Sequence, residues 1–184
     1  MNKIISNRNL TITALIAIAI IGRFIPHAPN FTPLGATALF AAAFFRNRWL
    51  AFLVPFVVLM ISNLILDNVV YAQEAFVWFG DYTLFQVNAF ILVVLAGRFL
   101  LQKVNVQNLL VASLSASMIF FLLSNLGAWL GHGMYPLTTN GLLAAYTAGI
   151  PFFWNTLAGD LVYSAMLFSA YALIKVKLPK LVMA

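Results

Sequence analysis

Apolar residues are grouped in six stretches along the chain, and the segments between these stretches carry most of the charged residues. Stretches of this length and hydrophobicity are typical of transmembrane helices. The pattern therefore predicts an all-α integral membrane protein, in which residues 1–184 form a single transmembrane domain. The six predicted transmembrane segments are Leu10–Ile25, Leu34–Phe45, Trp49–Leu66, Thr83–Leu101, Leu109–Leu130 and Pro151–Ile174.

The second stretch is unusually short. As a helix, its twelve residues cover about 18 Å, whereas the hydrocarbon layer is about 30 Å thick. The segment before it, Pro26–Pro33, contains three prolines and cannot form a regular helix. We expect this loop after the first helix to dip into the outer half of the membrane. Irregular backbone is tolerated at that depth only inside protein or beside a wet cavity, so the loop is a candidate cavity wall or lid.

Nine of the ten Lys and Arg residues lie on one set of alternating connections, and Arg23 is the exception. Basic residues in short loops favour the cytoplasmic side, so this distribution places both termini in the cytoplasm. Lys3 and Arg8 before the first stretch would also suit a signal peptide. The segment that follows this stretch offers no small-x-small cleavage site, so we expect a retained first helix. The predicted location is a bacterial cytoplasmic (inner) membrane, with acids on the outer side at Asp67, Glu74 and Asp81.

The composition narrows the class of protein further. Hydrophobic residues make up 64% of the chain and charged residues 8%, which leaves too little polar surface for a soluble domain. We therefore interpret the net charge of +6 as anchoring to anionic lipid of the bilayer rather than as nucleic-acid binding. No cysteine is present, which excludes disulfides, thiolate metal sites and cysteine nucleophiles. We predict neither a cofactor nor a metal site.

Known catalytic motifs are missing from the sequence. It has no Gly-rich phosphate loop ending in lysine, no HExxH and no GxSxG. The sequence therefore predicts that the protein is not an enzyme and has no nucleotide-hydrolysing site of its own. Energy for transport would have to come from a partner or a gradient.

Polar residues near the outer ends of the apolar stretches predict a pocket that opens outward. Asp160 lies about 14 Å inside the last stretch. A carboxylate at that depth costs about 2.5–3.5 kcal/mol unless it is paired or hydrated, and Arg23 is the nearest predicted cation. The predicted substrate-binding residues are Arg23, His27, Asn30, Asn63, Asp67, Asn125, Trp129, Tyr135, Asn155 and Asp160.

These residues also have structural interpretations. Amide side chains often form hydrogen bonds between membrane helices, and Asp67 and Arg23 could face the interface or the headgroups. His27 and His132 are too isolated to indicate a metal site. Aromatic residues near the outer boundary could contact either lipid or a flat ligand.

The connection between the fifth and sixth stretches predicts a second lid. Met134–Gly141 is rich in turn signals, Leu142–Gly149 is expected to form a short helix at the outer interface, and Pro151 suits the first turn of the last helix. Small residues four apart predict close helix packing. These pairs are Ala38 and Ala42, Ala112 and Ala116, Ser113 and Ser117, and Gly127 and Gly131.

Several runs of the sequence resemble an uncharacterised family of small bacterial membrane proteins. That family is similar to the substrate-binding S components of energy-coupling-factor vitamin transporters. The resemblance implies a six-helix S-component-like bundle with an outward-facing site capped by the loop after the first helix, and a partner in the form of an ATPase-driven energising module. The runs that carry it are Arg23–Pro33, Ala38–Phe44, Ser124–Trp129, Tyr135–Pro136 and Ile150–Asp160.

Two departures from this pattern limit what the resemblance implies. Related solitary vitamin B12 transporters use a cysteine near the cobalt, and this chain has none. The small-residue docking pattern of the first helix is also imperfect, with Thr13 and Ala17 as the nearest match. Docking to a shared energising module is therefore a weaker expectation than the fold.

Two functions are compatible with the sequence. The first is capture and uptake of a small vitamin-like or nucleobase-like molecule. The second is a non-transporting membrane scaffold or assembly subunit, in which the polar residues bind helices together and the outer loops bind a protein partner. A ligand bound in the outer pocket would support uptake, whereas a protein partner bound to the outer loops would support the scaffold function.

Overall fold

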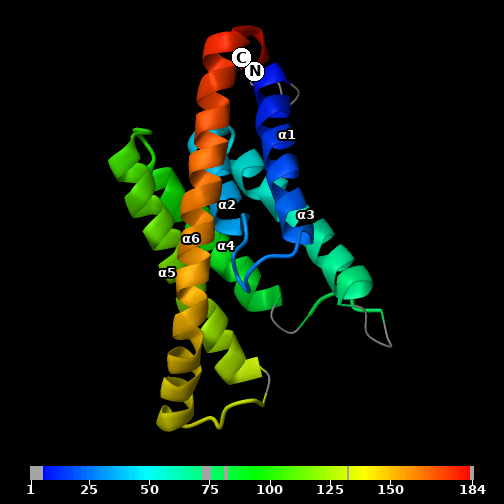
Figure 1. The fold of residues 1–184 in the computed structure, drawn as a ribbon, viewed down its shortest axis with the longest axis vertical. Helices are drawn as coiled ribbons and strands as arrows, with labels where there is room; N and C mark the ends of the chain where they lie inside the picture. Colours follow the sequence, from blue (N-terminus) through cyan, green and yellow to red (C-terminus); the bar gives the residue numbers. More distant parts are fainter. Residues whose placement is uncertain (1–5, 72–75, 81–82, 132, 183–184) are drawn as a thin grey trace.

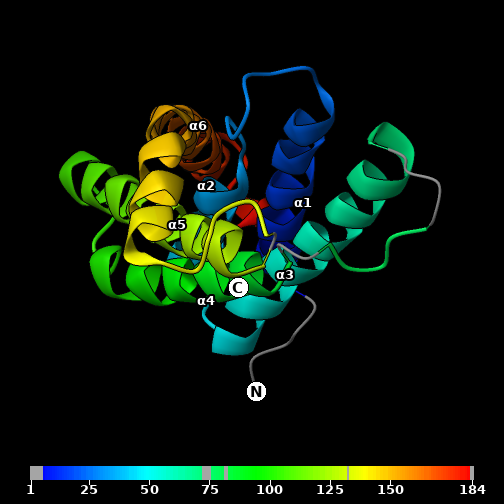
Figure 2. The ribbon, with the colours of Figure 1, turned by 90° about the horizontal axis from the view of Figure 1, so that it is seen from below.

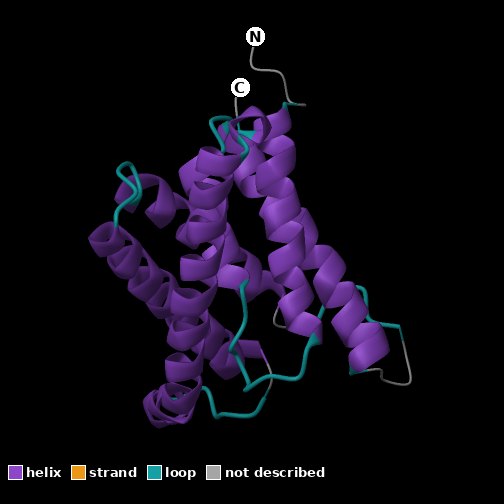
Figure 3. Cartoon of the chain, turned by 45° about the horizontal axis from the view of Figure 1, so that its top comes forward, coloured by secondary structure: helices purple, strands orange, loops and turns teal. Residues whose placement is uncertain are grey.

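The computed structural model describes residues 6–71, 76–80, 83–131 and 133–182, and within these ranges the chain forms helices and loops without strands (Figure 3). The all-α prediction is thus confirmed for this part of the chain. Four charged or titratable residues used in the sequence argument, Lys3, Glu74, Asp81 and His132, lie outside the described ranges. The elements, labelled as in Figure 1, are α1 (Asn7–Ile21), η1 (Gly22–Phe24), α2 (Leu34–Phe44), α3 (Arg48–Ile65), η2 (Leu66–Val70), α4 (Thr83–Leu100), α5 (Val106–Gly131), α6 (Thr139–Lys177) and η3 (Pro179–Leu181).

Four of these helices are long and apolar enough to cross a membrane. They are α3 with its π-helical extension η2, then α4, α5 and α6. Helix α1 has 15 residues and α2 has 11, which correspond to about 22 Å and 16 Å. The short second helix is therefore confirmed, whereas six complete crossings are not shown.

The exposed surface of α3 suits contact with lipid. Its exposed apolar residues recur every four positions, which places them on one face of the helix. Ala51 and Leu59, on the opposite face, are fully buried. The exposed stripe consists of Trp49, Leu53, Val57, Ile61 and Ile65.

Helix α2 lies in the middle of the bundle (Figure 2). It packs against α1, α3, α4, α5 and α6, and nearly all of its residues are buried. Small residues allow this close approach: a Cβ atom at Gly97 of α4 would lie 2.9 Å from the Ala42 Cβ. The predicted packing surface of α5 is confirmed at Ala112, Ser113, Ala116 and Ser117, all of which are buried, whereas Gly131 has open space around it.

Two arginines bind the carboxyl end of α2. Arg8 of α1 donates a hydrogen bond from Nη2 to the Phe44 carbonyl, and Arg98 of α4 donates from Nη1 to the Phe45 carbonyl at 2.8 Å. The last carbonyls of a helix have no partner within the helix and carry its negative dipole end. These arginines therefore stabilise the carboxyl end of α2.

Helix α6 corrects one sequence prediction. Leu142–Gly149 is not a separate interfacial helix, because α6 runs without a break from Thr139 to Lys177 with Pro151 inside it. Proline removes one backbone hydrogen bond, but the segment before it is held on α5. Tyr146 donates a hydrogen bond to the Leu122 carbonyl at 2.8 Å, and the buried Gly149 lies against Asn125. Packing on α5 thus maintains the helix across the proline.

The beginning of α1 and the segment after α6 meet at one end of the bundle (Figure 1). Asn7 donates a hydrogen bond to the Lys180 carbonyl at 3.3 Å, and Thr11 donates to the Leu181 carbonyl at 2.8 Å. The carboxyl end of α2, with Arg8 and Arg98, lies toward the same end. This agrees with the predicted grouping of basic residues, while the side of the membrane they face stays a prediction.

Candidate ligand-binding site

The proline-rich loop between α1 and α2 folds back along α6 (Figure 1). Asn155 of α6 donates a hydrogen bond to the Pro29 carbonyl at 2.9 Å, and the Phe31 ring packs on Tyr163 with the ring centres 5.8 Å apart. Further along, a Cβ atom at Gly159 would lie 2.9 Å from the Thr32 nitrogen. Glycine at this position therefore allows the loop backbone to lie directly on the helix.

Asn30 forms the sharp corner of this loop. It has a φ of 64°, in the left-handed region that asparagine tolerates better than most residues. The corner is closed by hydrogen bonds from the Phe31 nitrogen to the Ala28 carbonyl and from the Thr32 nitrogen to the Asn30 carbonyl, each of 3.0 Å. The resulting geometry brings Asn30 to the edge of two cavities.

The larger of these cavities has a volume of about 350 Å³. It lies between the ends of α1 and α3, the beginning of α4 and the second half of α5. Its walls combine one cation, one carboxylate and several uncharged polar groups with three aromatic rings, which is the mixture typical of small-molecule sites. The lining residues are Arg23, Asn30, Leu66, Asp67, Tyr71, Phe85, Gln86, Phe120, Ser124, Gly127 and Ala128.

Arg23 is oriented by hydrogen bonds to α3. Its Nη1 atom donates to Ser62 Oγ and to Asn63 Oδ1, the latter at 2.9 Å. Asn63 in turn donates to Gln86 Oε1 at 2.7 Å. This chain of hydrogen bonds joins η1, α3 and α4 behind the cavity, so Asn63 supports the site from outside its lining.

A second cavity of about 190 Å³ adjoins the first at Asn30, Phe120 and Ser124. It lies between α5 and α6, and four phenylalanines give it a largely aromatic wall. Asn125 contributes an amide oxygen close to Gly149. The lining residues are Asn30, Phe120, Phe121, Ser124, Asn125, Gly149, Phe152, Phe153 and Thr156.

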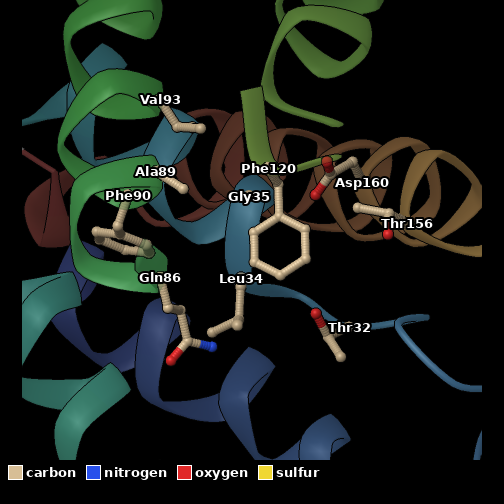
Figure 4. A pocket seen from close by; sticks show the side chains of 10 residues that line it. All are labelled: Thr32, Leu34, Gly35, Gln86, Ala89, Phe90, Val93, Phe120, Thr156 and Asp160. Atoms are coloured by element: carbon tan, nitrogen blue, oxygen red, sulfur yellow. The ribbon is translucent and has the colours of Figure 1, made fainter. Parts of the chain in front are cut away.

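A third, much smaller cavity of about 20 Å³ lies deeper in the bundle (Figure 4). It contains Asp160, which is 1% exposed. It shares Phe120 and Gln86 with the large cavity, and Phe120 and Thr156 with the second. Its lining residues are Thr32, Leu34, Gly35, Gln86, Ala89, Phe90, Val93, Phe120, Thr156 and Asp160.

Asp160 is compensated by a helix end, and this differs from the predicted pairing with Arg23. Asp160 Oδ2 lies 2.7 Å from the Ser117 hydroxyl, which donates to it. The carboxyl group stands at the amino end of α2: a Cβ atom at Gly35 would lie 2.2 Å from Oδ1, and the Ala36 backbone N–H is a further neighbour. The positive end of the helix dipole favours a carboxylate there. Arg23, meanwhile, makes its described Nη1 hydrogen bonds to α3.

The remaining predicted residues lie outside the three cavities. Trp129 donates its indole N–H to the Pro136 carbonyl at 3.0 Å and so holds the connection between α5 and α6. Asn155 holds the proline-rich loop from α6. His27 is exposed, with Nδ1 2.8 Å from the Ala28 carbonyl, and Tyr135 is half-buried on the α5–α6 connection. Among the predicted residues, Arg23, Asn30, Asp67, Asn125 and Asp160 line the cavities.

Comparison with known proteins gives a match to one family, which covers residues 3–181. This chain belongs to DUF6580, a family of unknown function. No curated protein and no solved structure matches the chain. The family membership agrees with the predicted resemblance to an uncharacterised family, while the likeness to S components rests on the sequence runs alone.

Sequence reasoning missed the residue that joins the cavities. Phe120 lines all three, but one phenylalanine in an apolar stretch gives no sign that it faces a cavity rather than lipid. Gln86 and Ser117 were recognisable as polar residues within predicted helices. Their roles depend on neighbours from other helices, so the sequence offered no means of assigning them.

Proposed function

We propose that this protein captures a small molecule in a bacterial cytoplasmic membrane and takes part in its uptake. The observation that carries the proposal is the large cavity, because Arg23 and Asp67 lie with polar and aromatic side chains around a volume of about 350 Å³. If these polar residues only formed hydrogen bonds between helices, a cavity of this size would not be needed. The cavity lies toward the end of the bundle opposite the two termini, which corresponds to the outer side in the predicted topology.

The lining favours a particular kind of solute. One cation and one carboxylate in the same cavity suit a neutral, zwitterionic or mildly cationic molecule better than a phosphate or a polyanion. The rings of Tyr71, Phe85 and Phe120 suit a flat group. These features support a vitamin-like or nucleobase-like molecule.

The resemblance to S components supports the same proposal. Three of the runs that carry it provide cavity residues: Arg23 and Asn30 come from the first, Asn125 from the third, and Asp160 from the last. We propose on this basis an S-component-like bundle with six membrane segments, both termini in the cytoplasm, and energy supplied by an ATPase-driven partner module or a gradient.

A thermal-stability screen of the purified protein against a broad set of metabolites tests this proposal. A ligand at about 100 times its dissociation constant should stabilise the protein by about 2.7 kcal/mol. Phe120→Ala should reduce this stabilisation, because Phe120 lines all three cavities described above. Leu122→Ala, on an exposed side chain of the same helix, is the matched control and should keep it.

The opposite result would favour the scaffold function. In that case no metabolite would raise the melting temperature, and a stoichiometric membrane partner bound to the loops at the cavity end would co-purify. Substitutions in the cavity would then change stability alone.

A further inference from the structure

We infer that Asp160 is a specificity-determining residue, which accepts a hydrogen bond from an amino or amidine N–H at the deepest point of the ligand. The ligand class is then a flat organic base with an N–H edge, rather than an acid or a purely carbonyl-bearing ring. This inference rests on the proposed function and narrows it.

The first observation is an unpartnered oxygen. Asp160 Oδ2 accepts a hydrogen bond from the Ser117 hydroxyl. The carboxyl group also has the Ala36 backbone N–H as a neighbour, but the buried Oδ1 accepts no hydrogen bond of normal geometry in the described structure. A buried polar atom without a well-formed hydrogen bond destabilises the protein. A donor supplied by a ligand would recover this free energy, so the oxygen favours binding of a group that carries N–H.

The second observation is the shape of the space beside this oxygen. A volume of about 20 Å³ accommodates one water molecule or one small substituent. Figure 4 shows the carboxyl group of Asp160 on one side of the Phe120 ring and apolar side chains of α4 on the other. The walls contributed by Ala89, Phe90 and Val93 suit the edge of a flat ring better than a hydrated ion.

The third observation concerns the charge of the residues that line the small cavity and whether they donate or accept hydrogen bonds. Asp160 is the only charged residue among the described side chains that line this small cavity. Thr156 donates its hydroxyl hydrogen to the Phe152 carbonyl at 3.0 Å, so its oxygen presents a lone pair. Both groups therefore act as acceptors, which disfavours a carbonyl or carboxylate beside Asp160. Gln86, whose amide nitrogen can donate, lies on the other side of the Phe120 ring (Figure 4).

Phe120 connects this subsite to the rest of the site. Because Phe120 lines all three cavities, a ligand whose polar part lies near Arg23 and Asp67 could extend its ring edge past Phe120 toward Asp160. The small cavity would hold water in the unloaded protein and the N–H group in the loaded one.

Two pairs of probes test this inference, in which an exocyclic amine is exchanged for a carbonyl and the neighbouring ring nitrogen changes from an acceptor to an N–H. They are adenine against hypoxanthine and cytosine against uracil, measured by equilibrium dialysis with the full-length wild-type protein. We expect the amine member to bind about tenfold to a hundredfold more tightly in at least one pair, as hydrogen bonds to charged groups allow. In Asp160→Asn, which can donate as well as accept, the preference should fall to within about threefold.

A second variant keeps the inference testable if the Asp160→Asn protein does not fold. Ala89→Val fills the small cavity from α4 without changing the carboxyl group and should also remove the preference. Leu92→Val, on an exposed part of α4, is the control and should retain it.

Three results would overturn the inference: equal binding of amine and carbonyl members, an undiminished preference in a folded Asp160→Asn protein, or no binding of either amine probe. If the metabolite screen nevertheless finds a ligand, the proposed function stands and only the N–H subsite is wrong. If the screen finds none, both fall.

Discussion

At the scale of single residues, the carboxyl group of Asp160 lies directly against Gly35. The carboxyl group occupies the space in which any other residue at position 35 would place its Cβ atom. Glycine is here a requirement of close approach, since Gly35 lies within a helix where other residues are normally favoured. The same proximity places the carboxylate over the free N–H groups at the start of α2.

Gly35→Ala should therefore lower the thermal stability of the purified protein. The added methyl group would meet Oδ1 of Asp160 at 2.2 Å and force the carboxyl group away from α2. Overpacking of this kind costs about 1–3 kcal/mol. Gly131→Ala, at a helical glycine with nothing within 4 Å, is the control and should be nearly neutral. Equal melting temperatures for the two variants would show that Asp160 moves aside freely.

At the scale of elements, α2 is a short buried helix whose two ends are held by charged side chains. Asp160 lies at its amino end, and Arg8 and Arg98 bind its last carbonyls. Each charge is the one that the helix dipole favours at that end. An 11-residue helix is only marginally stable by itself, so burial and these end contacts account for its persistence.

Replacement of Arg98 tests this account. Arg98→Met should destabilise the protein by about 1–3 kcal/mol, because the carbonyls of Phe45 and Ala42 lose a charged donor. Arg98→Lys should retain part of the stability, since a lysine can still donate to one carbonyl. The exposed Arg46 offers the comparison, and Arg46→Met should change the melting temperature little. Equal effects at positions 98 and 46 would contradict the role of Arg98.

At the scale of the whole molecule, α5 and α6 are longer than the hydrocarbon thickness requires. Their 26 and 39 residues correspond to about 39 Å and 58 Å, against a layer of about 30 Å. Helices α1 and α2 are shorter than this layer. The cavities lie where the short elements end and the proline-rich loop packs against the long ones.

Cysteine labelling tests the proposed orientation of the molecule. The sequence has no cysteine, so single substitutions give no background signal. Asn140→Cys, at the exposed beginning of α6, should react with a membrane-impermeant maleimide in intact cells. Val104→Cys, in the exposed connection between α4 and α5, should react only after the membrane is permeabilised. The reverse pattern would place the cavity end in the cytoplasm.

The helical class, the short α2 and the irregular loop before it were predictable from the sequence alone. These features follow from local causes: hydrophobic runs predict helices, and three prolines within Pro26–Pro33 prevent one. The sequence also indicated Arg23, Asn30, Asp67, Asn125 and Asp160, because polar residues in apolar stretches are costly unless they line a cavity or bind one another.

The contacts of these residues depend on the packing of the helices and could not be predicted from the sequence. Asp160 lies against the start of α2 instead of pairing with Arg23, because the loop brings that helix end to α6. Helix α6 continues through Pro151 because contacts with α5 hold it on both sides, an effect that no local preference encodes. Phe120 belongs to the site because helices that are distant in the sequence pack around it. Hydrophobic patterning predicts where the helices form, but the surroundings of each side chain depend on how the helices pack.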